Sequence, residues 1–257
     1  MGNAIKLLGQ ALRDIEGMRL AHLEAGVAHN VIPREGSVGF TCLAGGGEQL
    51  AERLAALQAE ALAYLPAADS GLEFALQPAN WDSVLGVAES RVVIDLVAAF
   101  PHGAQAYSLE QPADLVDLSV NLAIARLRDG ELFLETSFRF FNLDQSQPLQ
   151  QTILALAAVY GLTVQPVVGY PGWQPDFNSA LLARGCALHE RLFGQAPAIK
   201  AIHAGLECGL IGEKFPGMDM LAMGPQLEHP HSPEERVDLE SMERLWKVVV
   251  ALLEHTE

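Results

Sequence analysis

The sequence predicts an α+β domain with an antiparallel sheet over residues 1–168, followed by an α/β segment over residues 169–257. The sheet is indicated by two stretches of alternating apolar and polar residues, 114–127 and 131–141, which are separated by a short loop. The α/β segment is indicated by helical and strand-like patterns that alternate from Leu149 onward.

The composition is that of an acidic globular protein. Half of the 257 residues are hydrophobic, which is enough to bury a core, and the formal net charge is −16. This charge argues against nucleic acid or an anionic membrane surface as a partner. The first apolar run is too short for a signal peptide and no segment reaches membrane-spanning length, so we expect a cytoplasmic location. Three widely spaced cysteines, Cys42, Cys186 and Cys208, suggest reduced thiols.

Helices and strands are both expected before the hairpin. Ile5, Leu8, Leu12 and Ile15 recur at helical spacing, and no good cap precedes them beyond Asn3, so the chain is expected to open inside a helix. The glycine run at 45–47 lacks the Lys-Ser/Thr pair of a phosphate loop and is interpreted as a linker or helix entry. The further elements expected here are strands at 18–24, 37–43 and 72–77 and helices through 50–65 and near 82–99.

The two alternating stretches form the clearest predicted hairpin. Its loop is interpreted as three residues, 128–130, with the glycine left-handed, because this length pairs even positions with even ones. The apolar even positions then face the core, with Ser119 opposite Arg139 and Asn121 opposite Ser137. The polar face is either a ligand-facing surface or, as is more common, a solvated face of the sheet.

The same alternation of elements continues on both sides of the rigid aromatic turn at 170–173. The expected helices lie at 149–160, at 179–192 and from Leu239 onward, and the expected strands at 163–168, 199–202 and 219–223. Asp238 is the expected cap of the last helix. The predicted buried stripe of that helix consists of Met242, Leu245, Trp246, Val249, Val250 and Leu253.

Two polar loops carry the residue types of a metal hydrolase. His231 lies in a proline-bounded loop with His229 two residues before it, which suits a metal ligand, although such a pair is by default two solvated histidines. His203 and Glu207 flank a glycine-containing turn. Glu207 has apolar neighbours, so we expect it to be partly buried or paired, in a site, a salt bridge or a cap onto backbone amides.

Several motifs, in the order found here, resemble the Xaa-His (aminoacyl-histidine) dipeptidases, also called cytosol non-specific dipeptidases, of the M20 metallopeptidases. The resemblance spans nearly the whole chain, and residues 45–113 match only in pattern. The matching stretches are Gly2–Leu8, Asn30–Glu35, Tyr170–Asp176, Ile202–Leu210, Met218–Met220, Gly224–Pro225 and Pro230–Glu235.

The resemblance implies a hydrolase that cleaves Xaa-His and other dipeptides with a water molecule activated by two zinc ions. It implies that His231 is the last metal ligand. It implies substrate-binding roles for Arg139, Asn30, His203 and Glu207. The Arg139 guanidinium would hold the terminal carboxylate of the dipeptide, and Asn30 would contact the substrate or shape the lid.

The resemblance also implies which parts of such an enzyme are present. Residues 1–168 correspond to the lid (dimerisation-type) domain and residues 169–257 to the last part of the catalytic domain. The general-base glutamate and most metal ligands come earlier in the family, so we expect this chain alone to be inactive. Self-association or a partner that supplies the N-terminal half is expected. The alternative interpretation is a non-catalytic lid that serves as an oligomerisation or peptide-binding module.

Overall fold

The chain divides into two compact units in the computed structural model. The first unit comprises residues 1–139 and 144–167, and the second comprises residues 140–143 and 168–257. Across the described ranges, none of the helices combines the length and the hydropathy that a membrane span requires. The residues that the structure describes are 2–43, 46–108, 115–141, 143–167, 169, 171–200, 206–229 and 234–254.

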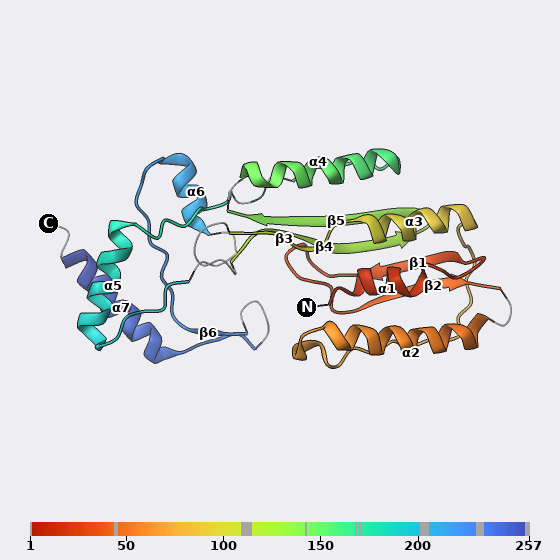
Figure 1. Ribbon diagram of the computed structural model, residues 1–257, viewed down its shortest axis with the longest axis horizontal. Helices are drawn as coiled ribbons and strands as arrows, with labels where there is room; N and C mark the ends of the chain where they lie inside the picture. The colour runs from red at the N-terminus through yellow and green to blue at the C-terminus, as the bar shows by residue number, and fades with distance from the viewer. Residues whose placement is uncertain are drawn as a thin grey trace. The chain divides into compact units, whose positions relative to one another are not determined.

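A five-stranded sheet forms the centre of the first unit (Figure 1). The order is β2-β1-β4-β3, and β5 also pairs with β4. The pairs of β1 with β2, β1 with β4 and β3 with β4 are antiparallel, so the predicted antiparallel sheet is confirmed. The strands are β1 (Arg19–Ala25), β2 (Gly36–Thr41), β3 (Gly103–Tyr107), β4 (Val116–Arg128) and β5 (Glu131–Phe140).

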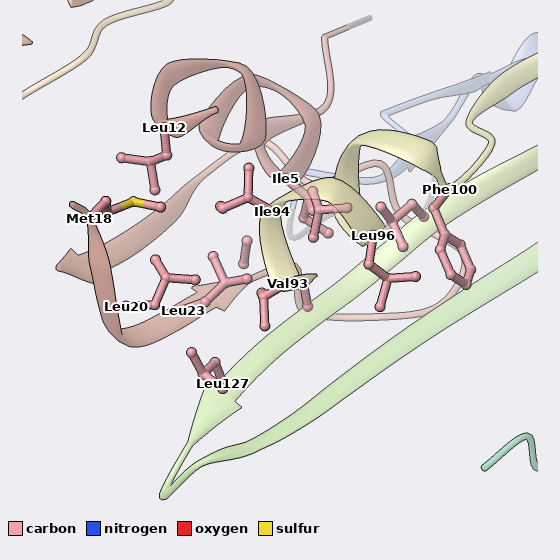
Figure 2. Packing of buried hydrophobic residues seen from close by; sticks show 14 of the residues in the cluster. Ile5, Leu12, Met18, Leu20, Leu23, Val93, Ile94, Leu96, Phe100 and Leu127 are labelled. Atoms are coloured by element: carbon pink, nitrogen blue, oxygen red, sulfur yellow. The ribbon is translucent and has the colours of Figure 1, made fainter. Parts of the chain in front are cut away.

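The helices of the first unit supply the other half of its core. Helices α1 and α3 contact each other and the sheet, and Ile153 of α4 joins the same buried cluster. The helices are α1 (Ala4–Leu12), α2 (Gly46–Tyr64), α3 (Val87–Ala99) and α4 (Leu143–Val159), with a 3-10 turn at Ala67–Asp69. Figure 2 shows the core side chains of α1, α3, β1 and β4 pointing toward one another, among them Ile5, Leu12, Leu20, Leu23, Val93, Leu96 and Leu127.

Helix α1 begins within the chain and has its own cap. Asn3 is 4% exposed, and its Oδ1 accepts hydrogen bonds from the backbone N–H groups of Ile5 at 2.9 Å and Lys6 at 3.3 Å. These bonds satisfy two of the amides that a helix start leaves without partners. The expectation that the chain opens inside a helix is therefore wrong.

The hairpin loop is shorter than the sequence analysis predicted. Strand β4 ends at Arg128 and β5 begins at Glu131, so the loop consists of two residues. Asp129 and Gly130 both have positive φ, 52° and 80°, which is the type I′ turn that suits the twist of a hairpin. The three-residue prediction was wrong because Asp129, like its glycine neighbour, adopts the left-handed conformation.

A change of phase in β4 compensates for the shorter loop. Val120 and Leu122 belong to the core cluster, as do Ala125 and Leu127, so the core-facing positions are first even and then odd. A Cβ on Gly26 would lie 1.9 Å from a carbonyl oxygen of β4 at the point of this change. Because the phase of β4 shifts by one residue, the even positions on the N-terminal side of the shift, Val120 and Leu122, face the core as the sequence predicts.

Several short predicted strands are not strands. Residues 72–77, 163–167 and 219–223 pair with no other strand; residue 168 and residues 201–202 of the predicted strand at 199–202 lie outside the described residues. In the first of these segments the Phe74 N–H donates to the Gln58 side chain at 3.0 Å and makes no ladder bond. A short alternating stretch becomes a strand only where a neighbour offers backbone partners.

The second unit contains three helices and a short hairpin. Its elements are α5 (Ala180–Phe193), α6 (Glu207–Lys214), β6 (Leu227–Glu228), β7 (Arg236–Val237) and α7 (Leu239–Glu254). Ser179 Oγ caps α5 by accepting from the Leu182 N–H at 2.9 Å. Asp238 Oδ1 accepts from the Ser241 N–H at 2.8 Å, which confirms the predicted cap of α7.

Helix α7 buries a different face from the one predicted. It packs against α5, and its buried residues are Val248 and Ala251. Met242, Trp246 and Leu253, three members of the predicted buried stripe, are 43%, 67% and 67% exposed. No described element of the second unit covers them, so α7 presents an apolar face to solvent.

Candidate functional site

Two polar side chains of the β4–β5 hairpin fasten the turn that follows β1. Asn121 Nδ2 donates to the Val31 carbonyl at 2.8 Å and to the His29 carbonyl at 3.3 Å. Ser137 Oγ donates to the same His29 carbonyl at 2.6 Å. Because both side chains reach one oxygen, Asn121 and Ser137 lie on the same face of the hairpin, in agreement with the sequence prediction.

Asn30 lies between the two fastened carbonyl groups and is exposed. The turn is closed by the Val31 N–H, which donates to the Ala28 carbonyl at 3.2 Å. Its far end is tied to α1, because the Ala4 N–H donates to the Pro33 carbonyl at 3.0 Å. The Asn30 side chain itself hydrogen-bonds to nothing in the described part of the chain, so its amide is available to a ligand.

Arg139 follows Ser137 on the same face of β5, two residues further along the strand. Such positions lie about 7 Å apart, and Arg139 is exposed. The structure therefore brings the Asn30 turn and Arg139 to one polar face of the first unit, with Ser137 linking them. A planar guanidinium and a carboxamide on one face are suited to bind a carboxylate and a peptide group.

This polar set of β4 also includes an acid that the sequence analysis missed. Asp117 is 6% exposed, and its Oδ1 has no hydrogen-bond partner in the structure as described. The Oδ1 of Asn121 is likewise buried without a partner. Alternation along β4 could have found Asp117, because it shares odd numbering with Ser119 and Asn121. Buried acceptors without donors lower stability, so each of these two oxygens costs free energy unless a donor reaches it.

A polar junction next to Asn121 holds the backbone of β4. His102 Nδ1 accepts from Asn3 Nδ2 at 3.2 Å and from the Leu122 N–H at 3.3 Å. Asn3 Nδ2 also donates to the Leu122 carbonyl at 2.9 Å. Burial, with a smaller contribution from the charge of Lys6, lowers the pKa of His102. Nδ1 must therefore be the unprotonated nitrogen of a neutral ring.

Lys6 fixes the end of α3 beside this junction. Its Nζ donates to three backbone carbonyls, those of Val97 and Ala98 at 2.8 Å and of Phe100 at 2.7 Å. A cation at this end of a helix complements the helix dipole and the carbonyls that the helix leaves without partners. Burial lowers the pKa of the Lys6 ammonium.

Glu207 stands at the start of α6 and is exposed. It forms no ion pair or side-chain hydrogen bond with the described residues, so the expectation that it is partly buried or paired is wrong. A carboxylate in the first turn is stabilised by the helix dipole and needs no partner. Partial burial, with a smaller contribution from the charge of Glu207, raises the pKa of the adjacent Cys208 thiol.

Two predicted site residues, His203 and His231, lie outside the described residues. His229, which is described, has a positive φ of 51°. Within the ranges that the structure describes, no three His, Cys, Asp or Glu side chains gather in a way that could hold a metal ion. The described residues therefore do not by themselves fit a two-zinc centre.

Comparisons with known proteins identify relatives of this chain. No protein-family model matches the chain. It is 31% identical to the cytosol non-specific dipeptidase of Escherichia coli K12 over 258 residues, which cover 98% of this chain and 53% of the relative. The crystal structure of aminoacylhistidine dipeptidase from Vibrio alginolyticus matches with a TM-score of 0.83 and 30% identity, over 98% of this chain and 52% of that one. The chain is thus a homologue of the cytosol non-specific and aminoacylhistidine dipeptidases that spans about half of their length.

Proposed function

We propose that this chain binds dipeptides and supplies the substrate-recognition part of a dipeptidase. The observation that carries the proposal is the polar face of the first unit, where a fastened turn presents Asn30 on the face that carries Arg139. Homology to dipeptidases over 98% of the chain supports the choice of ligand.

Each candidate residue has a role in this proposal. The Arg139 guanidinium holds the terminal carboxylate of the dipeptide through paired, charge-assisted hydrogen bonds. The Asn30 carboxamide hydrogen-bonds to the peptide group, and His203 and Glu207 are assigned to substrate binding. His231 is proposed as a metal ligand in a complete enzyme, where two zinc ions would supply an activated water molecule. We assign no step of hydrolysis to the described residues.

Hydrolysis is proposed to need residues beyond this chain, which spans about half the length of its relatives. The name of the Escherichia coli relative places that protein in the cytosol, and we propose the same compartment here. A second candidate, a non-catalytic oligomerisation unit, is favoured by the exposed apolar face of α7. The two candidates differ in whether the isolated chain recognises a dipeptide.

The test is a binding titration of the chain with the dipeptide Ala-His and with its C-terminal amide, which lacks the carboxylate. The unaltered chain should prefer the acid to the amide. Arg139→Ala should weaken binding of the acid by about 10- to 100-fold, the usual effect of losing a hydrogen bond to a charged group. It should leave the amide unaffected, and Arg139→Lys should recover part of the loss.

The matched control is Arg244→Ala, which removes an exposed guanidinium of α7 that pairs with Glu240. It should leave both affinities unchanged. Equal affinity of the unaltered chain for the acid and the amide would contradict the role of Arg139. Zinc-dependent hydrolysis of Ala-His by the chain alone, above a His231→Ala variant, would contradict the need for further residues.

A further inference from the structure

The Asn30 turn is held from both sides by side chains of other elements. Asn121 Nδ2 donates to the carbonyl before Asn30 and to the carbonyl after it, those of His29 and Val31. Ser137 Oγ donates to the His29 carbonyl as a second donor. Both partners of the Asn121 amide are carbonyl oxygens, so only its NH₂ group can face them.

We propose that Asn121 and Ser137 are positioning residues that hold the carbonyl groups of the two residues flanking Asn30 and so orient its carboxamide toward a bound dipeptide. This inference rests on the proposed function. The two residues touch the turn and are not themselves proposed to touch the dipeptide. They act through Asn30, whose exposed side chain hydrogen-bonds to no described residue.

The Asn121 side chain is poorly suited to a purely stabilising role. Its Nδ2 is used twice, while its Oδ1 is buried and accepts from no described group. An apolar side chain of similar shape would avoid leaving that acceptor without a donor. It would also lose both bonds to the turn, which only a donor at this point of β4 can make.

The position of Asn121 is itself firmly held. The next residue, Leu122, is fixed through its N–H by His102 and through its carbonyl by Asn3. The donor that fastens the turn is therefore part of the central strand and moves little. A turn ordered in this way binds its ligand at a lower cost in conformational entropy than a mobile one.

The test uses the 257-residue chain and two independent readouts. The first is hydrogen exchange of the Val31 amide, which closes the turn onto Ala28. The second is the affinity for Ala-His in the presence of an unchanged Arg139. Asn121→Asp removes the donor at nearly constant shape, and Ser137→Ala removes one of the donors with little change of volume.

Both variants are expected to exchange Val31 about 3- to 10-fold faster and to bind Ala-His about 3- to 10-fold more weakly, in proportion to the hydrogen bonds lost. Ser137→Thr retains the hydroxyl donor and should restore both values. The matched control is Thr136→Val, because Thr136 neighbours Ser137 and its hydroxyl forms no hydrogen bond with the described residues. It should change neither readout.

The outcomes separate this inference from the proposed function. Unchanged exchange of Val31 in both variants would overturn the fastening of the turn, whatever the chain binds. Faster exchange with unchanged affinity for Ala-His would overturn the positioning role and leave dipeptide binding in place. No binding of Ala-His by the unaltered chain would overturn the proposed function, and with it the positioning role.

Discussion

At His102, one ring nitrogen serves two donors. Nδ1 accepts from Asn3 and from the backbone of Leu122, which come from α1's cap and the centre of β4. If Nδ1 were protonated, it would become a donor facing the two donors of Asn3 and Leu122, and both hydrogen bonds to the ring would be lost. Burial and the nearby charge of Lys6 act in the same direction and lower the pKa of the ring.

We therefore expect the first unit to lose stability in mild acid. Because the folded-state pKa of His102 is lowered, its contribution is present above the ordinary histidine pKa of about 6.5 and is lost as pH falls toward the folded value. One such proton changes the free energy of unfolding by at most about 1.4 kcal/mol per pH unit, and by less here because the ring is only partly buried.

Substitution of His102 by Asn tests this source of pH dependence. Asn offers an acceptor oxygen near the place of Nδ1 and does not titrate, so His102→Asn should flatten the dependence of stability on pH between 7.5 and 5. Urea denaturation at the two pH values measures it. If the stability of His102→Asn changed with pH as much as that of the unaltered chain, the pH dependence would belong to other groups.

At the scale of elements, long periodic segments were predictable and short ones were not. Helices α5 and α7 follow the predicted ranges, and Asp238 caps α7 as expected, because a cap and a periodic stripe are local features. The strands expected at 72–77 and 219–223 are absent because their backbone groups find no ladder partner. Strand β3 was not predicted, because Gly103, Ala104 and Ala106 have a weak preference for strands. It forms nevertheless, because β4 supplies its backbone partners.

The candidate site was predictable in part. Asn121 and Ser137 were placed on one face, although the predicted loop was one residue too long and the phase change in β4 made up the difference. Asn30 followed only from resemblance, whereas alternation placed Arg139 on the polar face of the hairpin and resemblance added its role. The bonds from Asn121 to the Asn30 turn join segments about 90 residues apart, and no periodicity reports a contact of that separation.

Asp219, which the sequence placed in a strand, instead accepts hydrogen bonds at the start of helix α5. Its carboxylate accepts from Ser179 Oγ at 2.5 Å and from the Leu181 N–H at 2.9 Å, at the start of α5. The hydrogen bond from Ser179, followed by that from Leu181, lowers the pKa of Asp219. The contribution to stability is thus present above the ordinary aspartate pKa of about 3.9 and is lost as pH falls through the lowered folded value.

We expect Asp219→Asn to lower the melting temperature of the second unit by a few degrees at pH 7, with a smaller difference near pH 2. Thermal unfolding followed by circular dichroism at both pH values measures the effect. The control is Asp176→Asn, since among the described residues the Asp176 carboxylate accepts only from the nearby Asn178 N–H at 2.8 Å. Equal melting of Asp219→Asn and the unaltered chain at pH 7 would show that the cap adds nothing.

For the molecule as a whole, an apolar face and a strong net charge oppose each other. Trp246 and Leu253 of α7 are both 67% exposed, and burying such side chains is favourable by about 25 cal/mol for each Å² of apolar surface. The net charge of −16 disfavours close approach of two copies. Salt screens that repulsion and leaves the apolar attraction in place.

We therefore expect concentration-dependent self-association that strengthens with salt. Sedimentation or light scattering of the chain in low and high salt measures it. Trp246→Glu combined with Leu253→Glu should abolish association, whereas Val159→Glu, at a residue of α4 that is 79% exposed, should not. A monomer at all concentrations in high salt would contradict the expectation.

The three pairings of β4 have a consequence for the order of events during synthesis. Leu23 of β1 pairs with Leu127 of β4. After β1 is synthesised, about 100 further residues must be translated before this partner is available, which takes roughly 5–20 s at ribosomal speed. During that interval the apolar faces of α1, β1 and β2, and later that of α3, have no central strand to close over them. The nascent chain is therefore most prone to aggregate during this interval. The risk falls when the last residues of β4 leave the ribosome, because β4 can then pair with β1 and cover these apolar faces.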